Sequence, residues 1–222
     1  MKAFIVFAHP EPKSFNAALF RTAREALAGA GWEVRVSDLH AMGFNPVSDR
    51  RNFTTVKDPD TYKQQVEELH ATGAGGFAPD LEEEMAKLEW CDLFIMQTPL
   101  WWFGLPAMLK GWADRVLAMG RFYGDGRFYE QGVLRGRRAL LSLTTGGPPE
   151  AYEKGGFNGD IQAILRPILR GICEFVGLSV LAPNIVYAPA HITAEERAAA
   201  LAAYAARLGS IEKEEPMDVG QY

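Results

Sequence analysis

The sequence predicts an α/β protein built on one doubly wound, five-stranded parallel sheet with helices on both faces. Short apolar runs typical of buried parallel strands alternate with amphipathic, helix-like segments along the 222 residues. The chain has no internal repeat and no break in composition, which indicates a single domain over residues 1–211. Residues 212–222 are charged and are expected to form an extended tail.

The composition is that of an ordinary globular protein. With 48% hydrophobic and 23% charged residues, the chain can bury one large core. Its net charge of −5 argues against nucleic acid as a partner. No apolar stretch approaches the roughly 18 residues that span a bilayer, so we expect a cytoplasmic protein without membrane insertion. Cys91 and Cys173 lie beside apolar runs and are expected to be reduced, buried thiols.

The first part of the chain forms a β-α-β unit. Residues 2–8 are an apolar strand, and Ser14 is a good N-cap for an alanine-rich helix that reaches residue 30. Gly31 ends this helix, and residues 32–39 alternate between apolar and polar as a second strand.

A long excursion precedes the central strand. Residues 42–79 have poor periodicity and many Gly, Pro, Asp and Asn residues, with one polar helix near 60–71. A helix at 80–90 then leads to the buried strand at 93–96. Pro99 ends this strand because proline cannot donate to a strand ladder.

The last part of the chain adds two strands and three helices. Helices are expected at residues 106–119, 159–176 and 193–208, and strands at 137–143 and 178–188. Pro167 should kink the second of these helices. Thr193 and Glu196 form a capping box that begins the last helix.

The order of the strands follows from motifs that are missing. No GxGxxG pattern follows the first strand and no GxxxxGK[ST] pattern occurs, so neither a dinucleotide-binding Rossmann domain nor a P-loop is supported. The remaining arrangement is the flavodoxin-like order 2-1-3-4-5. Its ligand crevice lies outside the carboxyl ends of the strands, where the loops after strands 1, 3 and 4 converge.

These three loops predict a site for a flat, phosphate-bearing ligand such as a flavin. Residues 9–16 could hold phosphate at a helix N-terminus, although a plain capped turn has the same pattern. Residues 101–103 are three aromatics that cannot all point inward, so we expect stacking on a ligand, with core packing or a dimer interface as the alternative. Residues 144–147 could donate to a ring edge or form a simple glycine turn. Tyr152 and Asn158 could stabilise negative charge there, or be solvated surface residues.

Other chemistries find no support in the sequence. The four histidines, His9, His40, His70 and His191, lack metal-ligand spacing, so we expect no metal. No G-x-S-x-G elbow of a serine hydrolase occurs.

Several long motifs closely resemble the NAD(P)H:quinone oxidoreductases of the DT-diaphorase type. They are TPLWWFGLPAMLKGW at 98–112, LTTGG at 143–147, Tyr152 and FNGD at 157–160. The resemblance runs from Phe4 to about Pro216. It implies a homodimeric, flavodoxin-like enzyme that holds FAD, rather than FMN, without a covalent bond and builds each active site at the subunit interface.

The resemblance also implies roles for single residues. FAD would be held by His9, Phe15, Asn16, Ala18, Pro99, Leu100, Trp101, Trp102, Phe103, Gly104, Thr144, Thr145, Gly146, Gly147, Tyr152 and Arg197. Tyr152 would stabilise charge on the reduced ring, and Asn158 would be its catalytic partner. The substrate pocket would be lined by Phe103, Tyr123, Phe128 and His191, partly from the other subunit.

Three departures from the family pattern concern four residues. Asn158 stands where many members have a histidine, and asparagine cannot accept a proton as a charge relay would. Trp101 replaces the usual glutamine at the flavin edge. Arg170 and Glu174 occupy positions that are histidines in the metal-binding branch, which again indicates no metal.

The predicted function is that of an NAD(P)H dehydrogenase (quinone), in which hydride passes from a reduced nicotinamide to FAD and then to a quinone in a ping-pong reaction. A flavin-dependent azo- or nitroreductase would use the same first half-reaction. A flavin-bearing electron carrier, or a regulatory protein such as the accessory subunit of a potassium efflux system, is the alternative outside the enzymes. The aromatic loop at 120–136 favours an enzyme pocket.

Overall fold

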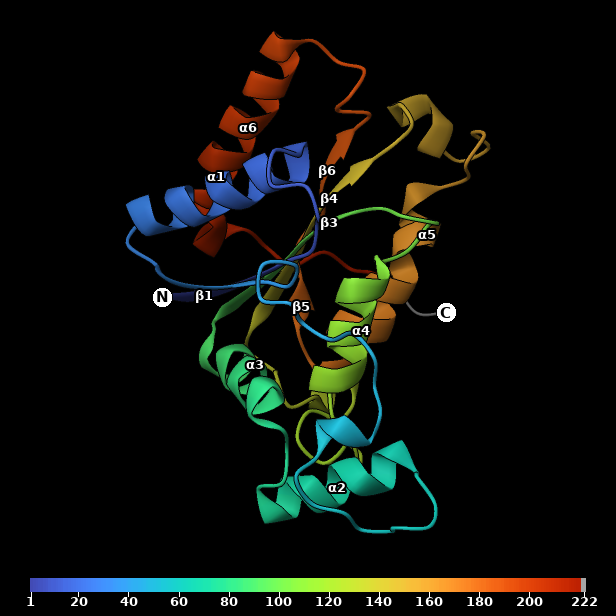
Figure 1. The fold of residues 1–222 in the computed structure, drawn as a ribbon. Helices are drawn as coiled ribbons and strands as arrows, with labels where there is room; N and C mark the ends of the chain where they lie inside the picture. Colours follow the sequence, from blue (N-terminus) through green and yellow to red (C-terminus); the bar gives the residue numbers. More distant parts are fainter. Residues whose placement is uncertain (221–222) are drawn as a thin grey trace.

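The computed structural model describes residues 1–220 and has a parallel sheet between two layers of helices (Figure 1). All strand pairs are parallel, in the order β2-β1-β3-β4, and β5 and β6 both pair with β4. The strands are β1 Lys2–Phe7, β2 Glu33–Asp38, β3 Leu93–Pro99, β4 Arg138–Thr145, β5 Ser179–Val180 and β6 Asn184–Tyr187. The helices are α1 Phe15–Gly29, α2 Gln64–Ala74, α3 Pro79–Trp90, α4 Ala107–Val116, α5 Ile161–Ile168 and α6 Ala194–Leu208. The predicted flavodoxin-like architecture with helices on both faces is confirmed.

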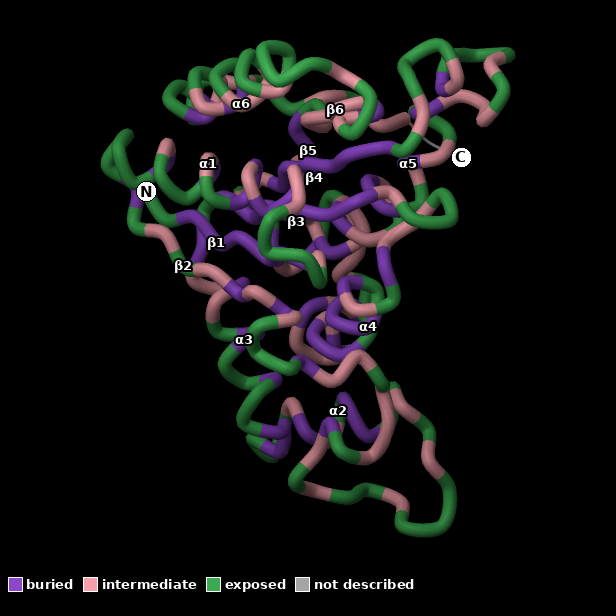
Figure 2. The backbone as a smooth tube through the Cα atoms, turned by 45° about the horizontal axis from the view of Figure 1, so that its top comes forward, coloured by how far each residue is buried: buried purple, intermediate pink, exposed green. Residues whose placement is uncertain are grey.

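Two apolar cores lie on opposite faces of the sheet because successive side chains of a strand point to opposite sides. Ile5 and Phe7 of β1 belong to the core beneath α1 and α6. Phe4 and Val6 belong to the larger core beneath α3, α4 and α5. The central strand β3 is buried along its whole length (Figure 2).

The prediction of a single fifth strand was wrong. The segment 178–188 is divided into β5 and β6, so the sheet has six strands rather than five. Leu181 still donates to the carbonyl of Ala139, but Pro183 has no N–H to continue the ladder. The carbonyl of Ala182 instead accepts a hydrogen bond from Arg207 of α6.

Other element boundaries shifted for local reasons. The helix α2 begins at Gln64 rather than near residue 60, because the Asp58 carboxylate accepts the amides of Asp60 and Thr61 and holds them in a turn. Thr144 and Thr145, predicted to lie in a loop, are the last two residues of β4.

The expected helix 159–176 is irregular after Pro167, where a kink was predicted. It starts at Ile161, widens into a π-helical turn at Leu169–Cys173 and ends in a 3₁₀ turn at Glu174–Val176. The capping box of Thr193 and Glu196 is confirmed at the start of α6.

The tail follows a 3₁₀ turn at Ile211–Lys213 and runs along the edge of the sheet. The amide of Met217 donates to the carbonyl of Val180 over 2.8 Å. The tail's last two residues, 221–222, lie outside the described residues. Across residues 1–220, no helix combines the length and the apolar character that crossing a bilayer requires.

Candidate functional site

A cavity of about 580 Å³ lies outside the carboxyl ends of the strands, where the three predicted loops meet. We call it the edge cavity. It is lined by His9, Lys13, Ser14, Phe15, Asn16, Ala18, Pro99, Leu100, Trp101, Thr144, Thr145, Gly146, Pro189, Ala190 and Arg197. Most of the residues predicted to hold the cofactor are therefore brought together within one protomer.

One end of the edge cavity is suited to an anion. The Ser14 hydroxyl caps α1 by accepting the amide of Ala17, and the first turn of this helix carries no acidic residue. The unpaired amides of a helix N-terminus and its dipole favour negative charge. Lys13 and Arg197 add two cationic side chains to the same wall. This end could hold a diphosphate.

His9 lines the edge cavity beside Trp101 as a neutral ring. Its Nδ1 accepts the backbone amide of Glu11 over 3.0 Å, so the ring proton sits on Nε2. Partial burial lowers the pKa of His9. The ring lies 5.9 Å from that of Trp101, measured between centroids. His9 can therefore donate a hydrogen bond without carrying a charge.

The opposite end of the edge cavity is bounded by a tight aromatic turn. Trp101 and Gly104 exchange two backbone hydrogen bonds, of 3.1 and 3.0 Å, across Trp102 and Phe103. Both of these residues have positive φ, 51° and 57°. A left-handed non-glycine residue costs roughly 1–2 kcal/mol, so the turn is strained. As a result all three rings are displayed, with exposed fractions of 45%, 98% and 51% along the chain.

Tyr152 and Asn158 lie side by side over Gly147. A β-carbon placed on Gly147 would stand 3.2 Å from the Tyr152 ring and 3.3 Å from the Asn158 amide nitrogen. The backbone N–H of Asn158 donates to the backbone carbonyl of Ala151, and this bond fixes the loop that carries both side chains. A side chain at position 147 would therefore press on both predicted catalytic residues. The Tyr152 ring and the Asn158 side chain thus meet just beyond the end of β4.

The loops after β3 and β4 are joined below the cavity. The amide of Leu100 donates to the carbonyl of Thr144 over 2.8 Å. Below them a chain of buried side chains connects Gln97, Asn16 and Thr144, with hydrogen bonds of 2.9 and 2.7 Å. Sequence reasoning missed Gln97, although a polar residue at the end of an apolar strand was a usable signal. It also missed Pro189 and Ala190, which follow β6 as the other loops follow their strands.

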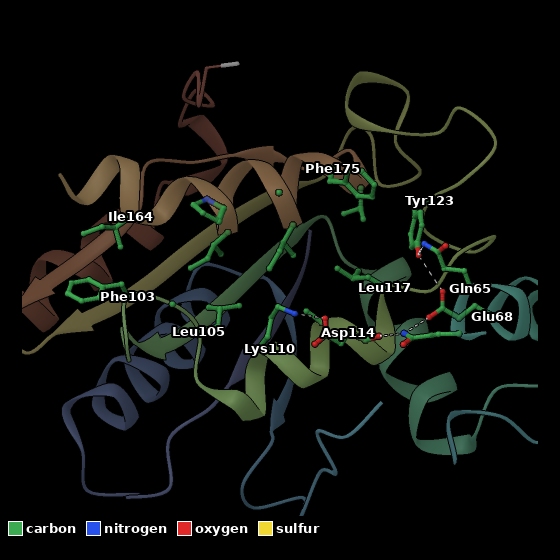
Figure 3. Close-up of a pocket in the computed structure, with 18 residues that line it drawn as sticks. Gln65, Glu68, Phe103, Leu105, Lys110, Asp114, Leu117, Tyr123, Ile164 and Phe175 are labelled. Atoms are coloured by element: carbon green, nitrogen blue, oxygen red, sulfur yellow. Dashed lines mark hydrogen bonds and ion pairs between the residues drawn. The ribbon is translucent and has the colours of Figure 1, made fainter. Parts of the chain in front are cut away.

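The predicted substrate residues are not brought together in one protomer. Phe103 lies at one end of a second cavity and Tyr123 at the other (Figure 3). Phe128 packs against Tyr123 and Phe175, at ring centroid distances of 6.4 and 5.2 Å. His191 follows β6 and donates its amide to Ala188, next to the wall of the edge cavity.

The second cavity, of about 690 Å³, is an apolar groove between α4 and the irregular helix that begins with α5. We call it the helical groove. It is lined by Gln64, Gln65, Glu68, Phe103, Gly104, Leu105, Lys110, Ala113, Asp114, Leu117, Tyr123, Ile164, Pro167, Ile168, Gly171, Ile172, Phe175 and Val176.

Glu68 is a buried carboxylate at the Tyr123 end of the helical groove. It accepts the amide of Met119 over 2.7 Å, the side chain of Gln64 over 2.8 Å and the Tyr123 hydroxyl over 3.5 Å. Burial raises the pKa of Glu68 despite these bonds. The Tyr123 hydroxyl in turn accepts from Gln65.

Arg170 and Glu174, which stand where the metal-binding branch of the family has histidines, form an ion pair. Arg170 and Glu174 are 2.7 Å apart, and the Arg170 guanidinium lies over the Tyr129 ring. Within residues 1–220, no three His, Cys, Asp or Glu side chains gather as a metal site would require. Both cysteines are free and buried, and burial raises the pKa of Cys91 and of Cys173 to about 12.

A parallel α/β sheet with a polar and aromatic crevice outside the carboxyl ends of its strands defines a protein of flavodoxin-like architecture. A family model described as "Flavodoxin-like fold" matches residues 1–209. The chain belongs to this family.

Comparison with known proteins narrows the class. The chain is 44% identical to ribosyldihydronicotinamide dehydrogenase (quinone) of Homo sapiens over 217 residues, which cover 97% of this chain and 94% of the relative. It is 43% identical to NAD(P)H dehydrogenase (quinone) 1 of Rattus norvegicus, over 97% of this chain and 79% of the relative. The solved structure of a Klebsiella pneumoniae protein assigned as a quinone reductase superposes with a TM-score of 0.94 at 38% identity, covering 97% and 86% of the two chains. The family predicted from the motifs is confirmed.

Proposed function

We propose that the protein is a homodimeric, FAD-dependent NAD(P)H dehydrogenase (quinone). The observation that carries this proposal is the edge cavity, in which an anion end and an aromatic, donor-rich end are complete within one protomer. The relatives named above are quinone dehydrogenases that match this chain over nearly its whole length. The protein is thus an oxidoreductase of quinones.

The residues of the edge cavity fit a flavin dinucleotide. The start of α1, with Lys13 and Arg197, supplies the positive potential that a diphosphate requires. Leu100 and Trp101 offer a flat apolar wall, and Thr144 to Gly147 offer backbone and hydroxyl donors to a polar ring edge. A cationic end suits the phosphate of FMN as well as the diphosphate of FAD, so the choice of FAD in our proposal rests on the resemblance to the quinone oxidoreductases and not on the cavity. When bound, the flavin supplies hydride acceptance from a nicotinamide and hydride delivery to a quinone.

Tyr152 and Asn158 are the proposed catalytic residues. Both side chains stand over Gly147 just beyond the end of β4, which supports a shared role toward one ligand. A preorganised donor stabilises negative charge as it develops without reorganisation. The Asn158 amide can donate a hydrogen bond but cannot release a proton at neutral pH. Its role is therefore electrostatic, and the proton for the reduced quinone comes from water or from another acid.

The substrate site requires a second copy of the chain. Phe103 and His191 lie near the edge cavity, whereas Tyr123 and Phe128 lie at the far end of the helical groove. A single protomer cannot enclose one substrate with both sets. The groove offers the apolar surface that a subunit interface needs. Two-fold pairing across it would give each site Tyr123 and Phe128 from the partner.

Reduced nicotinamide and quinone take turns at one site in the proposed ping-pong reaction. Asn158, Tyr152 and the aromatic turn orient each ligand in the same place. The hydride donor is NADH or NADPH in our proposal. Ribosyldihydronicotinamide is a second candidate, favoured because relatives that match 94% of their length carry its name.

The test is to purify the protein, release and identify its flavin, and follow the bound flavin anaerobically with each donor, with and without menadione. We expect released FAD, bleaching of the flavin spectrum by a nicotinamide, and its recovery on adding menadione. Recovery with an azo dye or nitroarene but not with a quinone would assign the protein to the azo- or nitroreductases. A bound flavin that no nicotinamide bleaches would indicate an electron carrier or regulatory protein instead.

A further inference from the structure

Gln97 is a fully buried amide within the central strand. It follows the apolar residues Leu93 to Met96 of β3, and it does not line the edge cavity. Its carbonyl oxygen has no hydrogen-bond partner within the described part of the chain. Burying an unpaired acceptor is unfavourable, so packing alone would favour leucine or methionine here. The residue therefore has another use.

The amide nitrogen of Gln97 begins a directed chain of hydrogen bonds. It donates to Oδ1 of Asn16 over 2.9 Å, and Nδ2 of Asn16 donates to Oγ1 of Thr144 over 2.7 Å. Because the Asn16 oxygen is engaged by Gln97, only its nitrogen can face Thr144. Asn16 and Thr144 are both buried, so water does not compete for these hydrogen bonds. These hydrogen bonds connect β3, α1 and β4, three of the elements that border the edge cavity.

The direction of these hydrogen bonds decides whether the Thr144 hydroxyl acts as a donor or as an acceptor toward the edge cavity. Its hydroxyl oxygen already accepts from Asn16, and the backbone carbonyl of Thr144 is taken by the amide of Leu100. The hydroxyl proton has no acceptor among residues 1–220, while Thr144 borders the edge cavity. A hydroxyl that accepts one bond is free to donate another. Thr144 therefore presents a donor to whatever occupies the cavity.

We propose that Gln97 is a positioning residue that orients Asn16 and so makes the Thr144 hydroxyl a hydrogen-bond donor to the bound flavin ring. This inference rests on the proposed function. Asn16, predicted to contact the cofactor, acts here mainly through Thr144, since both polar atoms of its side chain are engaged within the protein. The oxidised ring carries several acceptor atoms, and a fixed donor favours the orientation that uses it.

The test is a double-mutant cycle on FAD affinity of the apoprotein, with Gln97→Met, or Gln97→Leu as a second apolar variant, and Thr144→Val. Methionine keeps the size of glutamine but donates nothing, so the Asn16 amide can turn and the Thr144 hydroxyl can donate to it instead. We expect Gln97→Met to weaken FAD binding roughly three- to tenfold, and Thr144→Val to weaken it by a similar factor. The double variant should bind no worse than Thr144→Val alone.

Two further readouts separate positioning from a structural effect. The absorbance spectrum of bound FAD should change in the same sense in both single variants, because both remove one donor to the ring. The melting temperature of apo Gln97→Met should not fall, since an unpaired buried acceptor is removed with the amide. Ser142→Ala is the matched control, a buried hydroxyl of β4 that Asn184 bonds and that does not border the cavity; it should leave FAD affinity unchanged.

The inference would be overturned if the double variant weakened FAD binding by the product of the two single factors. Unchanged FAD affinity in Gln97→Met would also overturn it. If Gln97→Met does not fold, Gln97→Leu also removes the donor to Asn16 and enters the same cycle with the same criterion. Failure of the unmodified protein to bind FAD would instead contradict the proposed function, so the two failures are distinguishable.

Discussion

The edge cavity and the helical groove are of similar volume but are built in different ways. The edge cavity is formed by strand ends and the start of a helix, and its polar groups come from five separate segments of one protomer. The helical groove is formed by the sides of helices, and its lining is mainly apolar, with Gln64, Gln65 and Glu68 at one end. Figure 3 shows the groove extending from Phe103 to Tyr123.

This difference teaches which part of an active site a single chain can complete. The parallel register of β1, β3 and β4 brings their carboxyl ends to one line, so the edge cavity follows from the sheet itself. The helical groove is formed by helices instead, and Tyr123 at its far end does not line the edge cavity. The comparison therefore predicts that damage to the groove affects assembly, whereas damage to the edge affects the cofactor and chemistry.

The largest effect is expected from a charge placed in the groove. Ile164 is a half-buried groove residue, and Ile164→Glu would bury an unpaired carboxylate at the proposed interface. We expect a monomer by sedimentation, a loss of quinone turnover of about 100-fold or more, and retained FAD binding. Val56→Glu, at an exposed valine outside the groove, is the control and should change none of these. A dimeric, active Ile164→Glu variant would remove the groove from the interface.

The second largest effect is expected on the turnover number when Tyr152, just beyond the end of β4, is changed. Tyr152→Phe removes a hydroxyl that stands over Gly147 beside Asn158, while the ring remains packed against Tyr187. Loss of one preorganised donor should lower the turnover number by about 10²-fold with little change in oligomeric state. Steady-state kinetics with menadione, together with sedimentation, make this measurement. An unchanged turnover number would show that Tyr152 is a packing residue.

A smaller effect should follow from Asn158→His. An imidazole can donate a proton, which the asparagine amide cannot, and it titrates near pH 6.5. We expect the turnover number of the variant to rise as the pH falls through about 6.5, by up to roughly tenfold relative to the unmodified protein. Parallel pH profiles of the two proteins from pH 5 to 8 would test this, and identical profiles would exclude position 158 from the protonation step.

The smallest effect is a pH dependence of stability at the polar end of the groove. Burial raises the pKa of Glu68 above its ordinary 4.5, so the folded state holds this proton more tightly than the unfolded state. Its stabilising contribution is full below pH 4.5 and is lost as the pH rises through the folded-state pKa. The melting temperature of the unmodified protein relative to Glu68→Gln should therefore fall between pH 4 and pH 8. A constant difference over this range would mean that the charge on Glu68 is fully compensated by Gln64, Tyr123 and the Met119 amide.

The fold and the position of the edge cavity could be predicted because they depend on patterns that can be read directly from the sequence. Buried parallel strands are continuous apolar runs, and residues that follow them must meet at one edge of the sheet. Asn16, Leu100 and Thr144 lie far apart in the sequence, yet this rule brought them together. The split of the fifth strand was missed because Pro183 was treated as part of an extended segment.

The features that the sequence did not predict depend on orientation rather than position. The unpaired oxygen of Gln97 and the direction of its hydrogen bonds are properties of three side chains in space. In the same way, the pattern of aromatic residues does not reveal that Phe103 and Tyr123 stand at opposite ends of a groove. Only the three-dimensional arrangement of α4 and the helix that begins with α5, on the two sides of the groove, shows this separation.

The most direct test of a shared active site is complementation between two inactive variants. One carries Gly147→Val, whose side chain would displace Tyr152 and Asn158, and the other carries Tyr123→Ala with Phe128→Ala. Heterodimers isolated with two affinity tags should recover about half of the quinone turnover of the unmodified dimer, because one of their two sites is intact. Activity no higher than that of the two parent variants would contradict the account, since it would place each complete site within one protomer.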